Sequence, residues 1–288
     1  MTTTLSYRTD AASAPDGTEI SYRQLGDGPG LVILHGAMSS AYNHMELAEA
    51  LASHFTVFVV DRRGRGLSGA YAPDAGLPEE AEDLIAVLRK TQAPYALGVS
   101  SGAIILLNAA PQIATLTRLC IFEPPLVSDA PTARAALARL NSELAAGDLT
   151  GALVTGMLSA KMGPRVFQCL PRWMLKAMLR GAVRHEPPTT AAGYVAMRDL
   201  APLLRYDFNV VVEMADRFEE FRSVATMTLL LGGSKSPRYL RDALTRLAQI
   251  LPQTRVQMLP GADHAVCWNK DRGGKPEAVA ATLRAFFA

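Results

Sequence analysis

The pentapeptide Gly98-Val99-Ser100-Ser101-Gly102 carries the clearest chemical signal in this sequence. An apolar run over 95–99 precedes Ser100, and a helical pattern over 101–110 follows it. A serine on such a strand-to-helix turn has its hydroxyl lifted above the sheet, and the free N–H groups that begin the helix point at the reacting oxygen. Because the turn is tight and strained, its close neighbours must be small. The pattern predicts Ser100 as a nucleophile; Ser101 lacks the symmetric glycine spacing.

The elements that must position this turn alternate between strand and helix. Short apolar runs bounded by turn residues predict strands that are buried on both faces. Strands separated by helices of about 10–15 residues indicate βαβ units and a parallel sheet. The predicted strands are 18–23 (an edge strand), 31–34, 56–60, 95–99, 118–122, 227–231 and 255–259, and the predicted helices are 42–53, 78–91, 101–110, 238–250 and 276–287.

Strand patterns nearly vanish between about 126 and 221, where Ala, Leu, Met and Arg dominate and Gly and Pro interrupt the chain. This composition predicts several short helices. A helical insert in an α/β chain suggests a cap over the carboxyl edge of the sheet, where ligands bind in open α/β sheets. We therefore predict an α/β fold with a mostly parallel central sheet and flanking helices. Its core domain would be 1–125 and 222–288, and its all-helical cap 126–221.

Three further segments follow predicted strands. They are His35-Gly36-Ala37-Met38 after 31–34, Asp61-Arg62-Arg63-Gly64-Arg65-Gly66-Leu67-Ser68 after 56–60, and Gly261-Ala262-Asp263-His264 after 255–259. Together with the serine pentapeptide they resemble the α/β-hydrolase family over essentially the whole chain. That family has a His-Gly oxyanion turn, an Asp-x-Arg-Gly-x-Gly-x-Ser loop and a catalytic histidine at these places, and the order of Ser before His fits. The resemblance implies a serine hydrolase with a helical cap.

The resemblance implies His264 as the general base. An imidazole titrates near neutrality, so it can take the proton from Ser100 and hand it to the leaving group. The oxyanion hole would use the backbone N–H groups of Ala37 and Ser101, and one such donor is typically worth about 3 kcal/mol. We interpret His35 as a structural residue of the oxyanion turn. The remaining histidines are predicted to be surface or packing residues: His44, His54 and His185.

The third member of a triad is where this chain departs from the family pattern. The family commonly places an acid shortly after the strand predicted at 227–231, but Ser236 stands there and no carboxylate follows until Asp242. Some family members carry the acid one strand earlier. Glu123, at the end of the strand predicted at 118–122, would lie beside the serine turn and could reach Nδ1 of His264. We predict Glu123 as the acid. Asp263, a dyad without an acid, and an acid at some other position stay open.

Two arginine-rich segments, 61–68 and 161–184, could contact an acidic partner. In the loop 61–68, Asp61 can satisfy loop amides, and Arg62, Arg63 and Arg65 are predicted to be solvated or paired. Between Lys161 and Arg184 stand six basic residues and no acid, and Arg172, Lys176, Arg180 and Arg184 recur every four residues, so they could form one helical face. We predict a solvated stripe with packing beneath it. An acidic substrate or carrier, a membrane surface and a homodimer contact stay open.

Composition excludes several other classes. The 288 residues contain 29 Lys and Arg against 27 Asp and Glu, a net charge of +2, so bulk charge does not suggest nucleic-acid binding. No apolar stretch approaches the roughly 20 residues of a membrane span. The first ten residues lack a basic start with an apolar run, so we expect no signal peptide and a cytoplasmic location. The three cysteines are widely spaced, so we expect buried thiols, leave one disulfide open, and predict no metal site.

The sequence therefore predicts a serine hydrolase that cleaves an ester, lactone or thioester through an acyl-enzyme, without a cofactor. The methionine-rich insert favours an apolar, adaptable pocket, and a small-to-medium hydrophobic substrate is predicted to contact Met38, Phe167 and Trp173. Two rivals stay open: a cofactor-free lyase or C–C bond hydrolase at the same site, and a non-catalytic small-molecule receptor on the same scaffold. The serine at position 100 argues against epoxide and haloalkane hydrolysis, which would use an aspartate there.

Overall fold

The computed structural model describes residues 6–72, 74–186 and 193–288. The signal-peptide prediction concerns the first ten residues, and the first five of these lie outside the described part. One eight-stranded sheet organises the chain, in the order β1-β2-β4-β3-β5-β6-β7-β8. Its strands are β1 (Arg8–Ser13), β2 (Glu19–Leu25), β3 (Gly30–Leu34), β4 (Thr56–Val60), β5 (Tyr95–Val99), β6 (Arg118–Phe122), β7 (Met227–Gly233) and β8 (Thr254–Leu259). The pairings β1–β2 and β2–β4 are antiparallel and the others are parallel. The mostly parallel sheet is confirmed.

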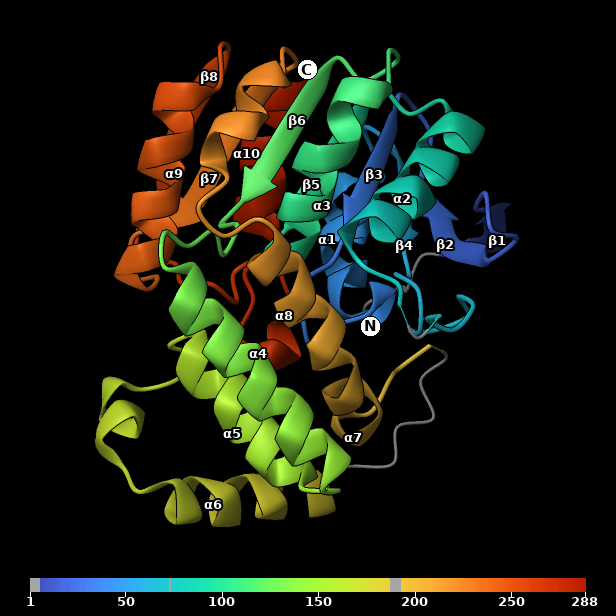
Figure 1. Cartoon of the computed structure of the whole chain (residues 1–288). Coiled ribbons are helices and arrows are strands. Elements are labelled where there is room, and N and C mark those ends of the chain that lie inside the picture. The colour runs from blue at the N-terminus through green and yellow to red at the C-terminus, as the bar shows by residue number, and fades with distance from the viewer. Residues whose placement is uncertain (1–5, 73, 187–192) are drawn as a thin grey trace.

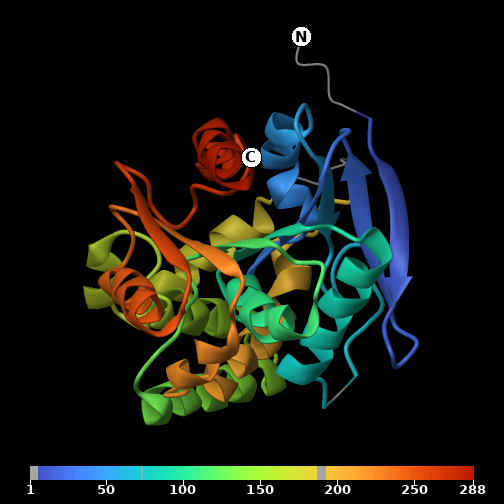
Figure 2. The same ribbon diagram turned by 90° about the horizontal axis from the view of Figure 1, so that it is seen from above.

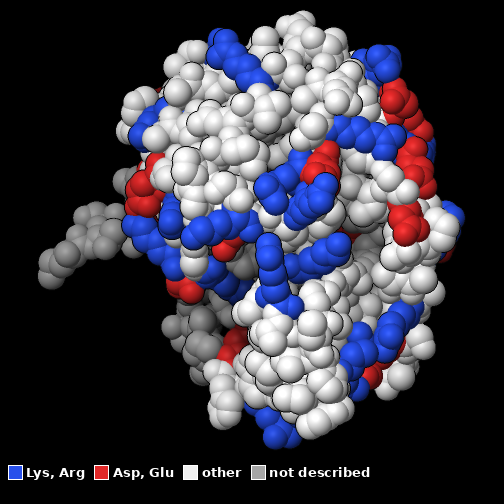
Figure 3. All heavy atoms as spheres, turned by 90° about the vertical axis from the view of Figure 1, so that its left-hand side faces the viewer, with Lys and Arg blue, Asp and Glu red and all other residues white. Residues whose placement is uncertain are grey.

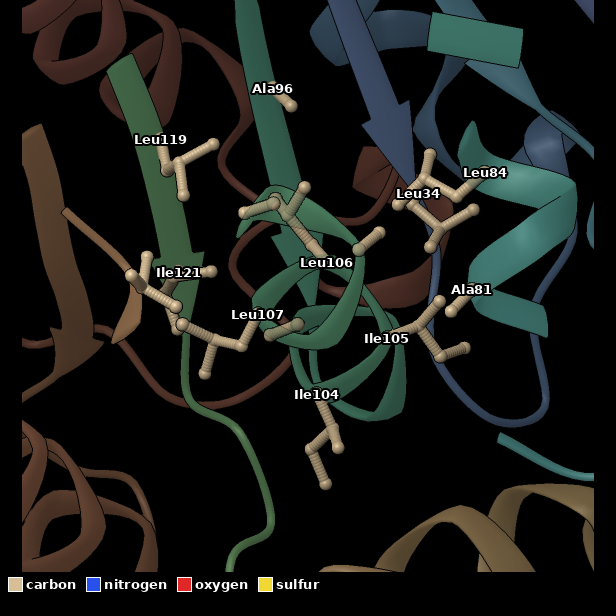
Figure 4. Packing of buried hydrophobic residues seen from close by; sticks show 14 of the residues in the cluster. Leu34, Ala81, Leu84, Ala96, Ile104, Ile105, Leu106, Leu107, Leu119 and Ile121 are labelled. Atoms are coloured by element: carbon tan, nitrogen blue, oxygen red, sulfur yellow. The ribbon is translucent and has the colours of Figure 1, made fainter. Parts of the chain in front are cut away.

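Helices cover both faces of this sheet, as Figure 2 shows from above. Successive strand residues point to opposite faces, so Leu31 and Ile33 of β3 join one apolar cluster and Val32 and Leu34 the other. The first cluster packs against α1 (Met45–Leu51) and α10 (Pro276–Phe287). The second packs against α2 (Leu77–Thr91), α3 (Ser101–Ala109) and α9 (Arg238–Ile250). Figure 4 shows α3 in that layer, between side chains of the strands and of α2. The apolar runs were strands because helices bury both of their faces.

Three features of the first 53 residues differ from the prediction. The segment 18–23 is not an edge strand, because β2 pairs with β1 on one side and β4 on the other. The edge strand β1 was missed because its sequence, RTDAAS, has no apolar alternation and its residues are mostly exposed. The predicted helix 42–53 is a 3-10 turn, Ala41–His44, followed by α1.

The insert between β6 and β7 is helical, and no strand occurs among its described residues. It contains α4 (Ala130–Ala145), α5 (Leu149–Ser159), α6 (Arg172–Arg184), α7 (Met197–Leu200), α8 (Leu204–Glu213) and short 3-10 turns that include Arg165–Cys169. In Figure 1 these helices lie below the carboxyl ends of the central strands. A third apolar cluster joins α4, α5 and α8, and the Ala37–Met38 turn of the core packs against it. The helix α8 also contacts α3 and α2.

The structure shows the state of the cysteines and whether any helix in the described part of the chain could span a membrane. All three cysteines are free thiols: Cys120 and Cys267 are buried, but Cys169 is exposed, which corrects the expectation that all three are buried. Across 6–72, 74–186 and 193–288, no helix combines the length and apolar character that a membrane crossing requires.

Candidate active site

Ser100 lies on a strained turn between β5 and α3. Its backbone has φ 55° and ψ −123°, a conformation that costs energy for any residue but glycine. Its N–H donates to the carbonyl of Phe122 at 2.9 Å, which ties the turn to the end of β6. Both flanking glycines are required: a Cβ on Gly98 would lie 2.6 Å from Ala103 Cα, and one on Gly102 would lie 2.4 Å from the carbonyl oxygen of His35. The pentapeptide is therefore shaped by close backbone contacts on both sides of the serine.

The turn after β3 lies directly against this serine. A Cβ on Gly36 would lie 2.7 Å from Ser100 Cβ and 3.3 Å from its Oγ. His35 holds the turn: its Nδ1 donates to the Gly36 carbonyl at 2.8 Å and its Nε2 accepts from the N–H of Arg62 at 3.2 Å. Burial, followed by the charges of Arg65 and Arg62, keeps the pKa of His35 well below its usual range. The ring is therefore neutral, which fixes this tautomer.

A buried glutamate meets the candidate base. Nδ1 of His264 donates to Oε2 of Glu123 at 2.7 Å, and Oε1 of Glu123 accepts from the N–H of Gly233 at 2.6 Å. The glutamate side chain is fully buried and the histidine side chain is 13% exposed. The imidazole also stacks on the ring of Phe122, with centroids 5.8 Å apart. Because Nδ1 is occupied, proton exchange is left to Nε2.

The other acids that were weighed do not meet this histidine. Asp242 is exposed and pairs with Arg238 on its own helix, at 3.3 Å. Asp263 is exposed, and its carboxylate accepts from the N–H of Ala265 at 3.0 Å. Ser236, where the family's acid would stand, is buried, and its Oγ has no hydrogen-bond partner within the described chain. Of the carboxylates that the sequence offered, the structure brings only Glu123 to His264.

The loop that carries His264 is anchored to a segment more than 200 residues earlier in the chain. Nδ1 of His44 donates to the carbonyl of Cys267 at 3.0 Å. The side-chain oxygen of Asn269 accepts from the N–H of Glu46 at 3.0 Å, and the backbone N–H of Asn269 donates to the Asn43 carbonyl at 2.8 Å. His44 was predicted to be a surface or packing residue, and it is buried. A buried imidazole therefore helps to hold the loop that carries His264.

Acid is expected to destabilise the protein through His44. Burial lowers the pKa of this histidine from 6.5 to about 4. Between these two values the unfolded chain binds a proton that the folded chain does not, so stability is lost as pH falls from 6.5 towards 4. A difference of this size amounts to about 3 kcal/mol at 1.36 kcal/mol per pKa unit. Urea unfolding at steps from pH 7.5 to 4 measures it. The variant His44→Gln should show a shallower decline, and parallel curves would contradict the assignment.

Of the three residues predicted to contact substrate, Met38 lies beside the serine turn. It adopts φ 51° two residues after Gly36 and packs against the apolar cluster of the insert. Phe167 lies in the 3-10 turn before α6 and is half-buried. Trp173 is 71% exposed on α6, a helix that packs on α5. Phe167 and Trp173 therefore both belong to the insert, in the 3-10 turn and the helix that follow α5.

Both arginine-rich segments form ion pairs. Arg62, Arg63 and Arg65 are buried and ion-paired, which is one of the two environments predicted for them. In the basic stretch, Arg172 pairs with Glu143 at 2.6 Å and Lys176 with Asp148 at 2.5 Å, so the prediction of a solvated stripe is wrong for these two. Arg180 and Arg184 are exposed. On the α9 and insert side of the molecule, Figure 3 shows Lys and Arg side chains across the middle of the face with acidic side chains among them.

One buried carboxylate near the serine was missed. Asp207 of α8 accepts from the Ser101 hydroxyl at 2.7 Å and from Arg62 and Arg65 at 2.6 Å each. A single acid in a helix is typical of a solvated face, so no local pattern distinguishes it.

Comparison with known proteins identifies the family. Residues 31–282 match the Alpha/beta hydrolase family. An alpha/beta hydrolase from Sphaerobacter thermophilus is 32% identical, with a TM-score of 0.76 over 97% of this chain and 100% of that one. The 2-(acetamidomethylene)succinate hydrolase of Mesorhizobium japonicum is 26% identical over 86% of this chain and 85% of its own. An esterase from Thermogutta terrifontis shares the fold, with a TM-score of 0.72 at 18% identity over 97% and 98% of the two chains. The chain belongs to the alpha/beta hydrolase family.

Proposed function

We propose that this hydrolase cleaves carboxylic esters, lactones or thioesters through a Ser100–His264–Glu123 triad. The observation that carries the proposal is the buried Glu123, whose carboxylate bonds Nδ1 of His264 at 2.7 Å beside the strained serine turn. Positive φ angles at Met38, Ser100 and Glu123 support it, because strained backbone clusters at functional sites.

The proposed reaction proceeds through an acyl-enzyme. Ser100 Oγ attacks the carbonyl carbon while Nε2 of His264 accepts the hydroxyl proton. The carboxylate of Glu123 holds the ring in the required tautomer and stabilises the imidazolium. The N–H groups of Ala37 and Ser101 would bind the oxyanion. His264 then protonates the leaving group as its bond to the carbonyl carbon breaks. A water molecule gives a proton to the same nitrogen while its oxygen bonds to the acyl carbon. The bond from that carbon to Ser100 Oγ then breaks, His264 returns the proton to Oγ, and the carboxylic acid is released.

The substrate is proposed to bind between the serine turn and the insert. We propose the core domain as 1–125 and 222–288 and the cap as 126–221, because the insert has an apolar cluster of its own. Met38 belongs to both surroundings, since it lies in the oxyanion turn and packs on that cluster. This apolar contact favours a small-to-medium hydrophobic acyl group. Phe167 and Trp173, both on the insert, stay proposed as further substrate contacts.

The name of the Mesorhizobium relative favours a second candidate substrate class. A substituted succinate carries two carboxylates, and that relative matches this chain over most of both lengths. Hydrolysis of an acidic substrate of this kind is therefore the alternative to a plain hydrophobic ester, and C–C bond cleavage and the receptor function are tested beside it.

A panel of substrates on the purified wild-type protein tests the proposal. We expect p-nitrophenyl acetate and butyrate to give repeated turnover, with an initial burst of p-nitrophenol no larger than the enzyme concentration. An aliphatic lactone, an acyl thioester, a β-diketone and 2-(acetamidomethylene)succinate distinguish the substrate classes. A receptor would bind one equivalent of ligand without multiple turnover. Turnover of the diketone or the succinate alone would replace the ester assignment.

A further inference from the structure

A buried cluster connects the insert to the residue that follows the nucleophile. Asp207, on α8 of the insert, is 2% exposed. Its Oδ1 accepts from Ser101 Oγ at 2.7 Å and from Arg62 Nη1 at 2.6 Å, and its Oδ2 accepts from Arg65 Nη2 at 2.6 Å. Burial acts to raise the pKa of Asp207, but the charges of Arg65 and Arg62 and the Ser101 hydroxyl together hold it below its usual value. The carboxylate is therefore ionised at neutral pH.

Arg62 joins both turns that would bind the oxyanion. Its Nη1 donates to Ser101 Oγ at 3.0 Å, and its backbone N–H donates to Nε2 of His35 at 3.2 Å. The other edge of its guanidinium forms two bonds, of 2.7 and 2.5 Å, with Glu80 on α2. Ser101 and the turn that begins at His35 are thus both bonded to Arg62. Asp207, on α8 of the insert, accepts a hydrogen bond from the guanidinium of the same arginine.

Stability alone is a weak explanation for such a cluster. Burying several charges carries a desolvation penalty, and their mutual attraction often does no more than cancel it. A well-packed apolar cluster can therefore be equally stable. The cluster does define geometry, because each charged group has few positions that satisfy its hydrogen bonds. Arg62 and Arg65 also occupy positions that the family loop pattern leaves unspecified, so that pattern does not account for them.

We propose that Asp207 is a positioning residue for the oxyanion hole. Through Ser101 and Arg62 it holds both oxyanion turns in place, so the hole is complete only when α8 of the insert is seated on the core. The inference rests on the proposed function, because it assigns a purpose to the backbone N–H groups of Ala37 and Ser101. A displacement of about 1 Å in such a group can cost a hundredfold in rate.

Two variants and a matched control test this role. Ser101→Ala removes the hydroxyl link but leaves both arginine pairs of Asp207, and Asp207→Asn weakens the whole cluster. The control Asp83→Asn alters another buried carboxylate, which forms bonds of 2.6 and 2.7 Å with Arg63 and does not contact Ser101. For each, kcat and KM with p-nitrophenyl acetate, the fluorophosphonate labelling rate at Ser100 and the melting temperature are measured.

We expect kcat and the labelling rate to fall between about tenfold and a hundredfold in Ser101→Ala and Asp207→Asn, with KM within about threefold of wild type. The double variant should lose no more than Asp207→Asn alone, because both changes break one connection. Asp83→Asn should melt earlier yet keep the wild-type kcat.

Three outcomes would overturn the inference. The first is a folded Ser101→Ala enzyme with wild-type kcat and labelling rate; this variant also decides the matter if Asp207→Asn does not fold. The second is an equal loss of kcat in Asp207→Asn and Asp83→Asn that follows their melting temperatures, which would mark a structural role only. The third is a wild-type protein that neither turns over esters nor labels at Ser100. That last result rejects the proposed function itself, whereas the first two leave it standing.

Discussion

Ser100→Ala is expected to abolish fluorophosphonate labelling and to lower kcat for p-nitrophenyl acetate by about four orders of magnitude or more. The reason is that Ser100 Oγ is the oxygen on which the proposed acyl-enzyme forms. The neighbouring Ser101 hydroxyl cannot replace it, because it donates to the buried carboxylate of Asp207 at 2.7 Å and is itself buried. Folding should be retained, because alanine keeps the backbone N–H through which residue 100 bonds the carbonyl of Phe122. Intact-protein mass spectrometry and steady-state kinetics provide both measurements.

The matched control for this prediction is Ser236→Ala. Ser236 is as buried as a core residue, yet its Oγ has no hydrogen-bond partner in the described chain, so removing it should change neither labelling nor kcat by more than about twofold. Covalent adduct on a peptide of the Ser100→Ala variant would reject Ser100 as the nucleophile.

Glu123→Gln is expected to lower kcat by about a thousandfold or more while Ser100 remains present. Both carboxylate oxygens accept hydrogen bonds, one from His264 Nδ1 and one from the N–H of Gly233. A glutamine has one oxygen and one NH2 group in their place, so one of these two donors must lose its acceptor. Either the glutamine faces the Gly233 N–H with its amide nitrogen, or His264 adopts the other tautomer and can no longer accept the proton of Ser100.

Asp263→Asn provides the comparison for this second prediction. It neutralises a carboxylate next to His264 in the sequence, but an exposed one that bonds the N–H of Ala265, so kcat should stay within about twofold of wild type. Melting temperatures of both variants separate a loss of fold from a loss of chemistry. Near-normal turnover in a folded Glu123→Gln variant would remove the glutamate from the triad and leave a Ser–His dyad.

Much of the core could be predicted because its elements are encoded locally. The runs 56–60, 95–99 and 118–122 coincide with β4, β5 and β6, since a strand buried between two helical layers needs apolar residues throughout. The same logic failed at β1, whose Arg8–Ser13 sequence is polar and small. The backbone pairing of β1 with β2 defines this strand, and such pairing does not require a hydrophobic pattern in the sequence.

The site shows the same division at the level of single residues. The sequence by itself determined that Ser100 stands on a glycine-flanked turn and that His264 follows the last strand, because both depend on neighbours within a few positions. Only the tertiary structure decided that Glu123, rather than Asp242 or Asp263, meets His264 across 141 residues. It alone placed Asp207 on Ser101, 106 residues away. Contacts between residues so far apart in the sequence depend on how whole helices and strands pack. The spacing of residues along the chain does not indicate which carboxylate that packing buries.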